Sequence, residues 1–285
     1  MMNRTIWLVL VLAVLLTGVL YSLPKVLVSS KDRSIATLQD STAASTKAQT
    51  EESNKSESES QHAVSLTAAQ QREAETLLQK FTSATSDPAK ISAAEGLAVF
   101  YGEVRKFDSA AKYAEVVAIL APTESNMVKA GDRYYDAFSF AAASQKAEVL
   151  GAKTREWYQK ALDKNPNLLN VKANLAMTYV STDTPMQGIM LLREVLAADP
   201  TNELALFNMG VLSMRSNQYN KAIERFRQLL KSNPTNSKAR FYLGVSLVQT
   251  GKTKEALEEL QRVKAQEKDP TIQAAIAELE KELKQ

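Results

Sequence analysis

Side chains that commonly carry out chemistry are scarce in this chain. It contains no cysteine, which rules out disulfides and thiolate metal sites. Its single histidine, His62, lies in a Ser- and Glu-rich stretch, so the part expected to fold has no imidazole to act as a base or bind a metal near neutral pH. No glycine-rich phosphate loop, metal-spaced acidic cluster or Ser/His/Asp set is present. We therefore expect no catalytic residues, no metal site, no cofactor and no enzymatic activity.

The charge balance also narrows the range of partners. The formal net charge is +3, from 35 Lys and Arg against 32 Asp and Glu, and the two signs are interleaved along the chain after residue 65. A nucleic-acid-binding protein normally carries a basic stripe. Because none is visible, we do not expect a nucleic-acid partner.

An uncharged apolar run of 18 residues, from Ile6 to Leu23, lies near the N-terminus. As a helix it would measure about 27 Å, close to the thickness of the hydrocarbon core of a bilayer. Trp7 and Tyr21 lie near its two ends, where amphipathic rings favour the membrane interface. We therefore predict a single-pass anchor, a transmembrane helix within residues 1–28, with the lipid bilayer as a partner.

The apolar run has one alternative interpretation, and two features of the sequence favour opposite orientations in the membrane. It could be a secretory signal peptide cut after residues 28–30, which would release a secreted protein, although signal cores usually have only about 7–15 apolar residues. Lys25, Lys31 and Arg33 against Arg4 would favour a cytoplasmic C-terminal part. A short tail before a long apolar run nevertheless resembles a bacterial export signal-anchor, and we expect the folded part outside the cytoplasm, on the periplasmic side.

Residues 29–65 have the composition of a disordered tether. Thirteen of the 34 residues from Ser29 to His62 are Ser or Thr, and large apolar side chains are almost absent. Such a stretch cannot bury enough surface to offset its ordering entropy. As a flexible coil it would span about 30 Å, so it would hold the folded part near a membrane and leave it free to reorient.

Prolines recur at a fixed spacing in the second half of the chain. Pro166, Pro200 and Pro234 are each 34 residues apart, and Pro122 lies 44 residues before Pro166. A proline after a helix prevents the helix from continuing. Counting back from each proline divides the chain into five units, the second with ten extra residues: 91–124, 125–168, 169–202, 203–236 and 237–270.

Small and bulky residues recur at matching positions within these units. The unit from 203 has Gly210 and Ala222 at its eighth and twentieth positions, and the unit from 237 has Gly244 and Ala256 there. With the period and the prolines, this pattern resembles the tetratricopeptide-repeat (TPR) family over residues 91–270. The resemblance implies an all-α solenoid of about five helix-turn-helix repeats. The family's aromatic fourth position is absent, and Lys172 and Arg240 stand there in two units.

Capping helices are expected at both ends of the repeats. Residues 66–90 would cap the first repeat, and residues 271–285 would cap the last. In the second unit we expect one long helix from about Asn126 to Leu150, a turn at Gly151 and a helix from Ala152 to Lys164. The C-terminal cap should bury one apolar stripe, formed by Ile272, Ile276, Leu279 and Leu283.

The TPR resemblance also implies where a partner would bind, because the first helix of each repeat lines the concave surface in this family. We expect Phe207, Met214, Phe241 and Tyr242 to face a ligand, since exposed aromatic and Met side chains favour partner contacts. Val211, Val245 and Asn208 could equally pack against neighbouring first helices, because a core stripe has the same spacing as a groove. The full set of candidate groove residues is Asn174, Met177, Val180, Phe207, Asn208, Val211, Met214, Arg215, Phe241, Tyr242, Val245 and Val248.

These features favour a membrane-tethered protein–protein interaction module. We expect an adaptor or assembly factor that binds an apolar peptide or helix of an envelope protein. The alternative is a self-associating structural scaffold, a homo-oligomer at the membrane. One well-known TPR class clamps a peptide C-terminal carboxylate, but the unit from 169 has Asn170, Ala173, Asn174 and Met177 at the corresponding positions, so that activity is not carried over.

Overall fold

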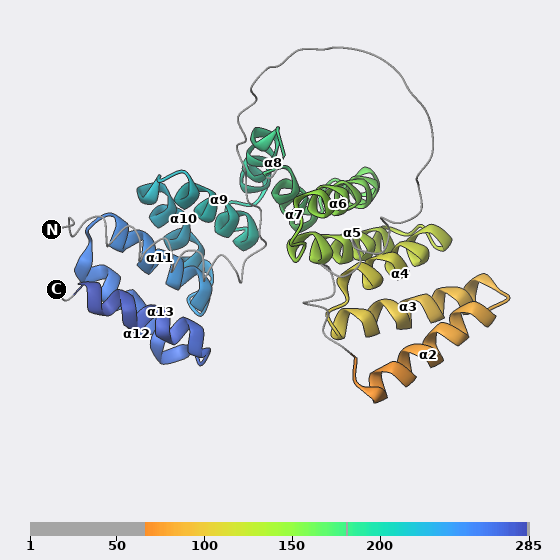
Figure 1. The fold of residues 1–285 in the computed structure, drawn as a ribbon. Coiled ribbons are helices and arrows are strands. Elements are labelled where there is room, and N and C mark those ends of the chain that lie inside the picture. Colours follow the sequence, from red (N-terminus) through yellow and green to blue (C-terminus); the bar gives the residue numbers. More distant parts are fainter. Residues whose placement is uncertain (1–65, 181, 284–285) are drawn as a thin grey trace, which may run out of the picture. The chain divides into compact units, whose positions relative to one another are not determined.

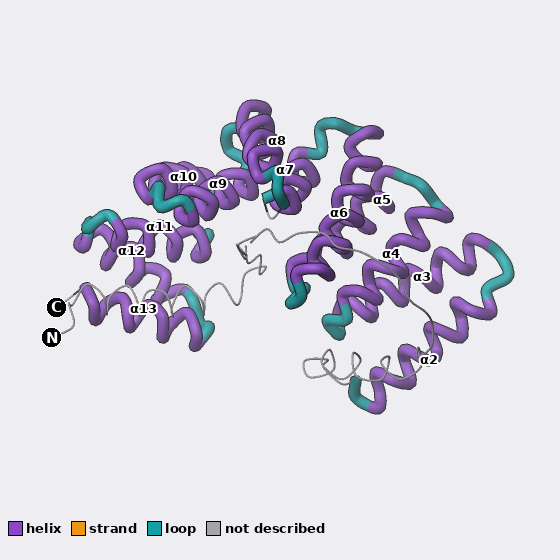
Figure 2. Tube along the Cα trace, turned by 45° about the horizontal axis from the view of Figure 1, so that its top comes forward, coloured by secondary structure: helices purple, strands orange, loops and turns teal. Residues whose placement is uncertain are grey.

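The computed structural model describes residues 66–180 and 182–283 of the 285-residue chain. These residues form twelve helices, α2 to α13, and contain no strand (Figures 1 and 2). They belong to two compact units, an N-terminal unit that ends at Pro122 and a C-terminal unit that begins at Thr123. Each unit is described by itself below.

The predicted anchor at Ile6–Leu23 and the tether of residues 29–65 lie outside the described residues. The anchor, its orientation and the alternative of a cleaved signal therefore remain predictions. Among the helices that the structure describes, none is both long and apolar enough to cross a bilayer.

The N-terminal unit consists of three helices, α2 (Ala68–Ser83), α3 (Asp87–Glu103) and α4 (Phe107–Leu120). Thr67 starts α2 with a capping box, because its hydroxyl accepts a hydrogen bond from the Gln70 amide and the Gln70 side chain accepts one from the Thr67 amide. The helices pack closely because their buried faces are rich in alanine, as in the Ala110, Ala111 and Ala114 stripe of α4.

The C-terminal unit contains nine helices that follow one another as pairs and a final cap (Figure 1). Three first helices begin at Leu169, Glu203 and Ser237, so they repeat the spacing of the prolines. The helices are α5 (Glu124–Ser139), α6 (Ser144–Lys164), α7 (Leu169–Tyr179), α8 (Pro185–Ala198), α9 (Glu203–Arg215), α10 (Tyr219–Ser232), α11 (Ser237–Gln249), α12 (Thr253–Gln266) and α13 (Pro270–Leu283).

The turns between repeats reuse the same side-chain hydrogen bonds. Asn202 accepts from the backbone amide of Ala205 at 3.0 Å and starts α9, and Asn236 accepts from Ala239 at 2.9 Å and starts α11. Before α9, the side chain of Asp199 accepts a hydrogen bond from the backbone amide of Thr201 at 2.9 Å, across Pro200. The recurring Pro and Asn thus end one helix and begin the next.

Small residues allow the two helices of a repeat to approach closely, as the sequence predicts. A Cβ atom on Gly210 would lie 2.6 Å from Cε1 of Phe226, and one on Gly244 would lie 2.8 Å from Cδ2 of Leu260. In the repeat of α7 and α8 the glycine lies on the second helix instead of the first. The backbone of Gly188 in α8 packs on the carbonyl oxygen of Ala176 in α7. Each of these three repeats therefore has a position where a larger side chain would separate the helices.

The second repeat differs from the predicted arrangement. The prediction of a continuous helix to Leu150 with a turn at Gly151 is wrong, because α5 ends at Ser139 and α6 begins at Ser144. Gly151 lies inside α6, where its absent side chain leaves room for the buried ring of Phe138. Because the chain turns before Ser144, α6 covers the apolar end of α5. The ten extra residues therefore lengthen both helices of the pair.

Two cations occupy the position where the family has an aromatic residue, and both form ion pairs with the second helix. Lys172 of α7 lies 3.4 Å from a carboxylate oxygen of Glu194 in α8, and Arg240 of α11 lies 2.7 Å from one of Glu259 in α12. The Arg240 pair is mostly shielded from solvent. These pairs join the helices of a repeat in place of an aromatic contact.

The C-terminal helix α13 docks on the last repeat, as predicted. Ile276 and Leu279 are buried in one hydrophobic cluster with Leu260 and Val263 of α12, and Ile272 and Leu283 pack at its edge. Lys264 of α12 also forms an ion pair with Glu280 at 2.8 Å.

Candidate functional site

The first helices of the repeats form the inner layer of the C-terminal unit. α7 contacts both α5 and α9, and α9 contacts α11, whereas no comparable contact joins successive second helices in this part of the chain. A stack that brings only its first helices together places them on its inner side. The candidate site is therefore the inner face of α7, α9 and α11.

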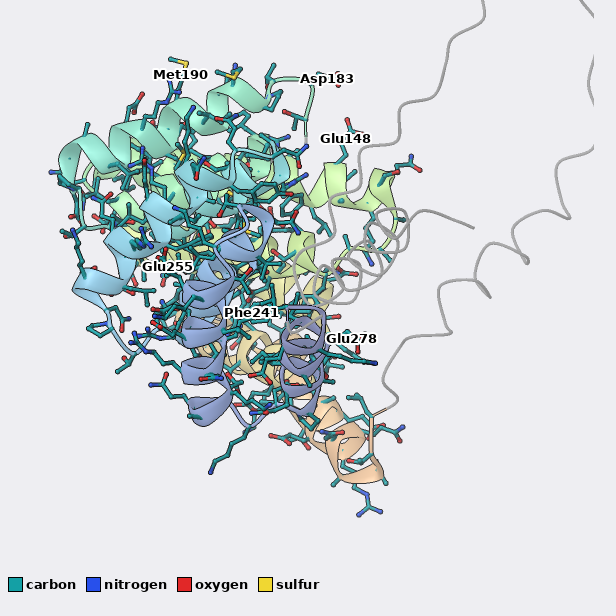
Figure 3. All side chains as sticks on the ribbon, turned by 90° about the vertical axis from the view of Figure 1, so that its left-hand side faces the viewer. Glu148, Asp183, Met190, Phe241, Glu255 and Glu278 are labelled. Carbon is teal, nitrogen blue, oxygen red and sulfur yellow. The ribbon has the colours of Figure 1, made fainter. Side chains whose placement is uncertain are left out.

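The structure divides the predicted groove residues into accessible and buried side chains. Arg215 is exposed, and six others are partly exposed: Asn174, Met177, Val180, Phe207, Val211 and Val248. The remaining five are buried: Asn208, Met214, Phe241, Tyr242 and Val245. Figure 3 shows Phe241 among surrounding side chains, while Met190 of α8 points outward at the edge of the unit.

The expectation that Met214, Phe241 and Tyr242 are exposed is wrong. Their exposed fractions are only 8%, 7% and 5%, and all three belong to the hydrophobic cluster of α9 to α13. Tyr242 packs on the ring of Phe226 at 5.9 Å and meets the ring of Phe207 edge-on at 5.5 Å. Their stripe is part of the core, and Phe207 is the aromatic residue that remains accessible.

Two polar groups on this face have no hydrogen-bond partner among the described residues, and one of them is fully buried. The side chain of Asn208 makes no hydrogen bond there, and its amide nitrogen is fully buried. The hydroxyl of Tyr242 likewise has none, and burial raises the pKa of this phenol. Buried polar groups are normally paired, because leaving one unpaired costs about 1–3 kcal/mol. The amide nitrogen of Asn208 has no exposed surface, so it is unpaired within the fold and closed to a ligand in this structure.

Lys238 is a site residue that the sequence analysis missed. It lies one turn before Tyr242 on α11, and its ammonium is 5.0 Å from the centroid of the Phe207 ring. Its side chain is exposed and forms no ion pair with a carboxylate among the described residues, and partial desolvation lowers the pKa of its ammonium. The sequence contained a signal for this. A lysine in a helix can pair with an acidic residue three or four residues later, and Lys238 has Phe241 and Tyr242 at those positions.

Asn174 of α7 is held by a network from the preceding repeat. Its amide nitrogen donates to the hydroxyl of Tyr158 at 3.4 Å, and this hydroxyl donates to a carboxylate oxygen of Asp132 at 2.7 Å. Burial raises the pKa of Asp132, and the hydrogen bond from Tyr158 opposes the shift. The described part of the chain contains no cluster of acidic residues or His that could hold a metal ion.

Comparisons with known proteins agree with this fold. Residues 213–279 match the family model described as Tetratricopeptide repeat. TTC0263, a thermophilic TPR protein of Thermus thermophilus, is similar in structure with a TM-score of 0.51 and 16% identity, over 66% of this chain and 98% of that chain. No protein of curated function matches the chain.

Two further solved structures show weaker similarity. MamA has a TM-score of 0.45 and 16% identity, over 62% of this chain and 91% of its own. YrrB, described as a TPR protein with an unusual peptide-binding site, has a TM-score of 0.43 and 15% identity, over 72% of this chain and 99% of its own. The family match and the Thermus structure together show that the chain has the TPR fold, with TPR sequence signatures in its last repeats.

Proposed function

We propose that this chain is a membrane-tethered TPR module that binds a peptide segment of another protein on the inner face of α9 and α11. The proposal rests on groups that have no hydrogen-bond or ion-pair partner among the described residues and that lie around the accessible ring of Phe207. Phe207 is partly exposed, the hydroxyl of the adjoining Tyr242 has no hydrogen-bond partner, and Lys238 has no acidic partner among the described residues.

The chemistry of this face suits a peptide better than a small charged metabolite. A peptide segment offers carbonyl and amide groups to the hydroxyl of Tyr242, and an apolar side chain to Phe207 and the neighbouring Val211. Arg215 on α9 and Lys238 on α11 are cations, whereas Glu203, one turn before Phe207, accepts a hydrogen bond from the side chain of Asn233. The face therefore favours a segment that is apolar with some acidic character.

The proposal is tested by selection of binding peptides. A random dodecapeptide library is displayed to the immobilised full-length chain, and the affinities of the retained peptides are measured by fluorescence anisotropy. Phe207→Ala should weaken binding by about 1–3 kcal/mol, as truncation of a central aromatic contact does. Phe140→Ala is the matched control, because Phe140 is 59% exposed and lies at the turn between α5 and α6.

Two results would contradict the proposal. The first is that Phe207→Ala, checked to be folded by its circular dichroism melt, binds the peptides as tightly as the wild-type chain. The second is self-association of the purified chain in sedimentation experiments that is lost in Phe207→Ala, since this would favour the scaffold alternative.

The membrane part of the proposal rests on the apolar run Ile6–Leu23 and the polar composition of residues 29–65. In this arrangement the TPR part works outside the cytoplasm as an adaptor or assembly factor for an envelope protein. An alkaline phosphatase reporter fused after His62 should then be active. An inactive fusion, beside an active cytoplasmic reporter at the same position, would reverse the orientation.

A further inference from the structure

The outer side of α8 exposes two methionine side chains to solvent. Met186 and Met190 are 56% and 57% exposed, and they lie four residues apart, so they share one side of the helix. Arg193 and Ala197 continue this row and are also exposed. Figure 3 shows Met190 pointing outward. Apolar side chains next to a cation on one helix face are typical of surfaces that lie at the interface of a membrane.

The neighbouring outer helix α10 carries an excess of positive charge. It has four cations against one acidic residue, Glu224. The side chain of Gln228 donates a hydrogen bond to the carbonyl oxygen of Pro200 at 2.8 Å, so α10 lies beside the end of α8. Arg227 is paired with a carboxylate of α12. The other three cations form no ion pair among the described residues: Lys221, Arg225 and Lys231.

The repeat pattern places two cations where the next repeat has an ion pair. Arg227 and Glu255 join α10 to α12. The residues 34 positions earlier are Arg193 on α8 and Lys221 on α10, and neither forms an ion pair among the described residues. Like charges at adjoining positions repel each other, and an anion between them removes that repulsion. This part of the outer face is therefore suited to contact with anionic groups.

We infer that the outer face formed by α8 and α10 docks on the surface of an anionic lipid bilayer. Its cations contact lipid phosphates, and Met186 and Met190 enter the headgroup layer. The inference rests on the membrane tether of the proposed function. That tether favours a bilayer over an acidic protein as the occupant, because residues 29–65 span only about 30 Å as a coil and keep the folded part beside the membrane.

A weak contact is enough to orient a tethered part of a protein. Each Lys or Arg near an anionic surface strengthens association roughly fivefold, and Glu224 offsets part of this gain. The tether presents the outer face to the bilayer at a high effective concentration, so a few cations suffice. Docking through α8 and α10 leaves the inner face of α9 and α11 open to a protein partner, because the first helices lie on the other side of the stack.

The experiment measures which lysines are covered when the full-length chain is bound to vesicles. The chain is reconstituted in vesicles of phosphatidylcholine alone, or of phosphatidylcholine mixed with phosphatidylglycerol, and treated with a membrane-impermeant acetylating reagent. Mass spectrometry should show slower acetylation of Lys221 and Lys231 in the anionic vesicles only. Lys252 and Lys254, which are exposed at the start of α12, should react equally in both. High salt should remove the protection, because it screens exposed charges.

Substitutions that keep the measured lysines test the charges of this face. Arg193→Gln combined with Arg225→Gln should weaken docking roughly 25-fold and abolish the protection. The matched control is Arg72→Gln with Lys268→Gln, which removes the same charge from exposed positions on α2 and before α13. This control should keep the protection.

A second pair of variants tests the apolar part of the face. Met186→Gln with Met190→Gln changes no charge but removes apolar surface, so it should reduce the protection of the two lysines. Ile119→Gln is its control, because Ile119 is 62% exposed on α4, away from α8 and α10. Unchanged protection in the methionine variant would exclude α8 from the contact and contradict the inference.

Three further results would overturn the inference while the tether stands. One is equal acetylation of Lys221 and Lys231 in the two kinds of vesicle, and another is an equal loss of protection in Arg72→Gln with Lys268→Gln. The third is protection by soluble poly-glutamate but not by anionic vesicles, which would assign the face to an acidic protein. If the chain floats with vesicles of neither composition, the inference and the membrane part of the proposed function are both wrong.

Discussion

Substitution of Gly210 by alanine is a direct test of how closely α9 and α10 pack. The added Cβ would lie 2.6 Å from Cε1 and 2.7 Å from Cζ of Phe226. That ring is fully buried, with Tyr242 stacked on one side at 5.9 Å and Phe207 on another at 5.9 Å. Because the ring cannot move without displacing Tyr242, either the helices separate or the aromatic cluster rearranges.

Two opposing effects determine the sign of the change. Replacing a glycine inside a helix by alanine stabilises the helix by about 1 kcal/mol. Overpacking a well-packed core costs about 1–3 kcal/mol, and the trapped ring places Gly210 toward the upper end of that range. We therefore expect Gly210→Ala to lower the free energy of unfolding by about 1–2 kcal/mol, measured by urea unfolding followed by circular dichroism.

A double-mutant cycle with Phe226→Leu shows whether the ring is the cause. In the Phe226→Leu background the contact is relieved, so Gly210→Ala should become neutral or stabilising. Gly251→Ala is the control, because Gly251 has φ +71° and nothing lies within 4 Å of its added Cβ. Its backbone cost should be the same in both backgrounds. Stabilisation by Gly210→Ala in the wild-type chain, or the absence of coupling to Phe226, would refute the reasoning.

Two further predictions concern the ends of the C-terminal unit. Ile276→Ala should lower the free energy of unfolding by about 2–5 kcal/mol, because the Ile276 side chain is fully buried where α13 docks. An unchanged urea midpoint would show that this docking does not contribute to stability. Burial raises the pKa of Asp132, so the folded chain binds its proton more readily than the unfolded chain, and this contribution to stability is lost as the pH rises through the raised pKa. Asp132→Asn, which cannot ionise, should therefore gain stability relative to the wild-type chain as the pH rises above about 4, the ordinary pKa of an Asp carboxyl. A relative loss of stability in urea unfolding as the pH rises would contradict the assignment.

Much of the fold could be predicted because its determinants repeat along the chain. Pro200 and Pro234 follow the ends of helices, Asn202 and Asn236 begin the next ones, and Gly210 and Gly244 mark the close helix contacts. These are local signals, and a fixed period makes them visible without knowledge of the tertiary structure. The prediction for the second repeat is wrong because its ten extra residues break the register. Gly151 resembles a turn residue in the sequence, but it is a packing position inside α6.

The exposure of the groove residues could not be predicted in the same way. On a first helix, residues that face the ligand and residues that face the next repeat have the same spacing, so periodicity cannot separate them. Tyr242 is buried because Phe207 and Phe226 of the preceding repeat cover it. That contact joins residues far apart in the sequence, and only the packed stack determines it.

The unpaired amide of Asn208 follows from a combination of residues and not from its own position. The sixth residues of successive repeats are Asn174, Asn208 and Tyr242, and the buried residues 16 positions before them are Tyr158, Leu192 and Phe226. Only the first pair can form a hydrogen bond, since leucine and phenylalanine have no polar side-chain atom. The same repeat position therefore links two repeats at Asn174 and leaves a buried amide unpaired at Asn208. Equivalent positions of a repeat protein can in this way differ in their hydrogen bonding while every repeat keeps the same fold.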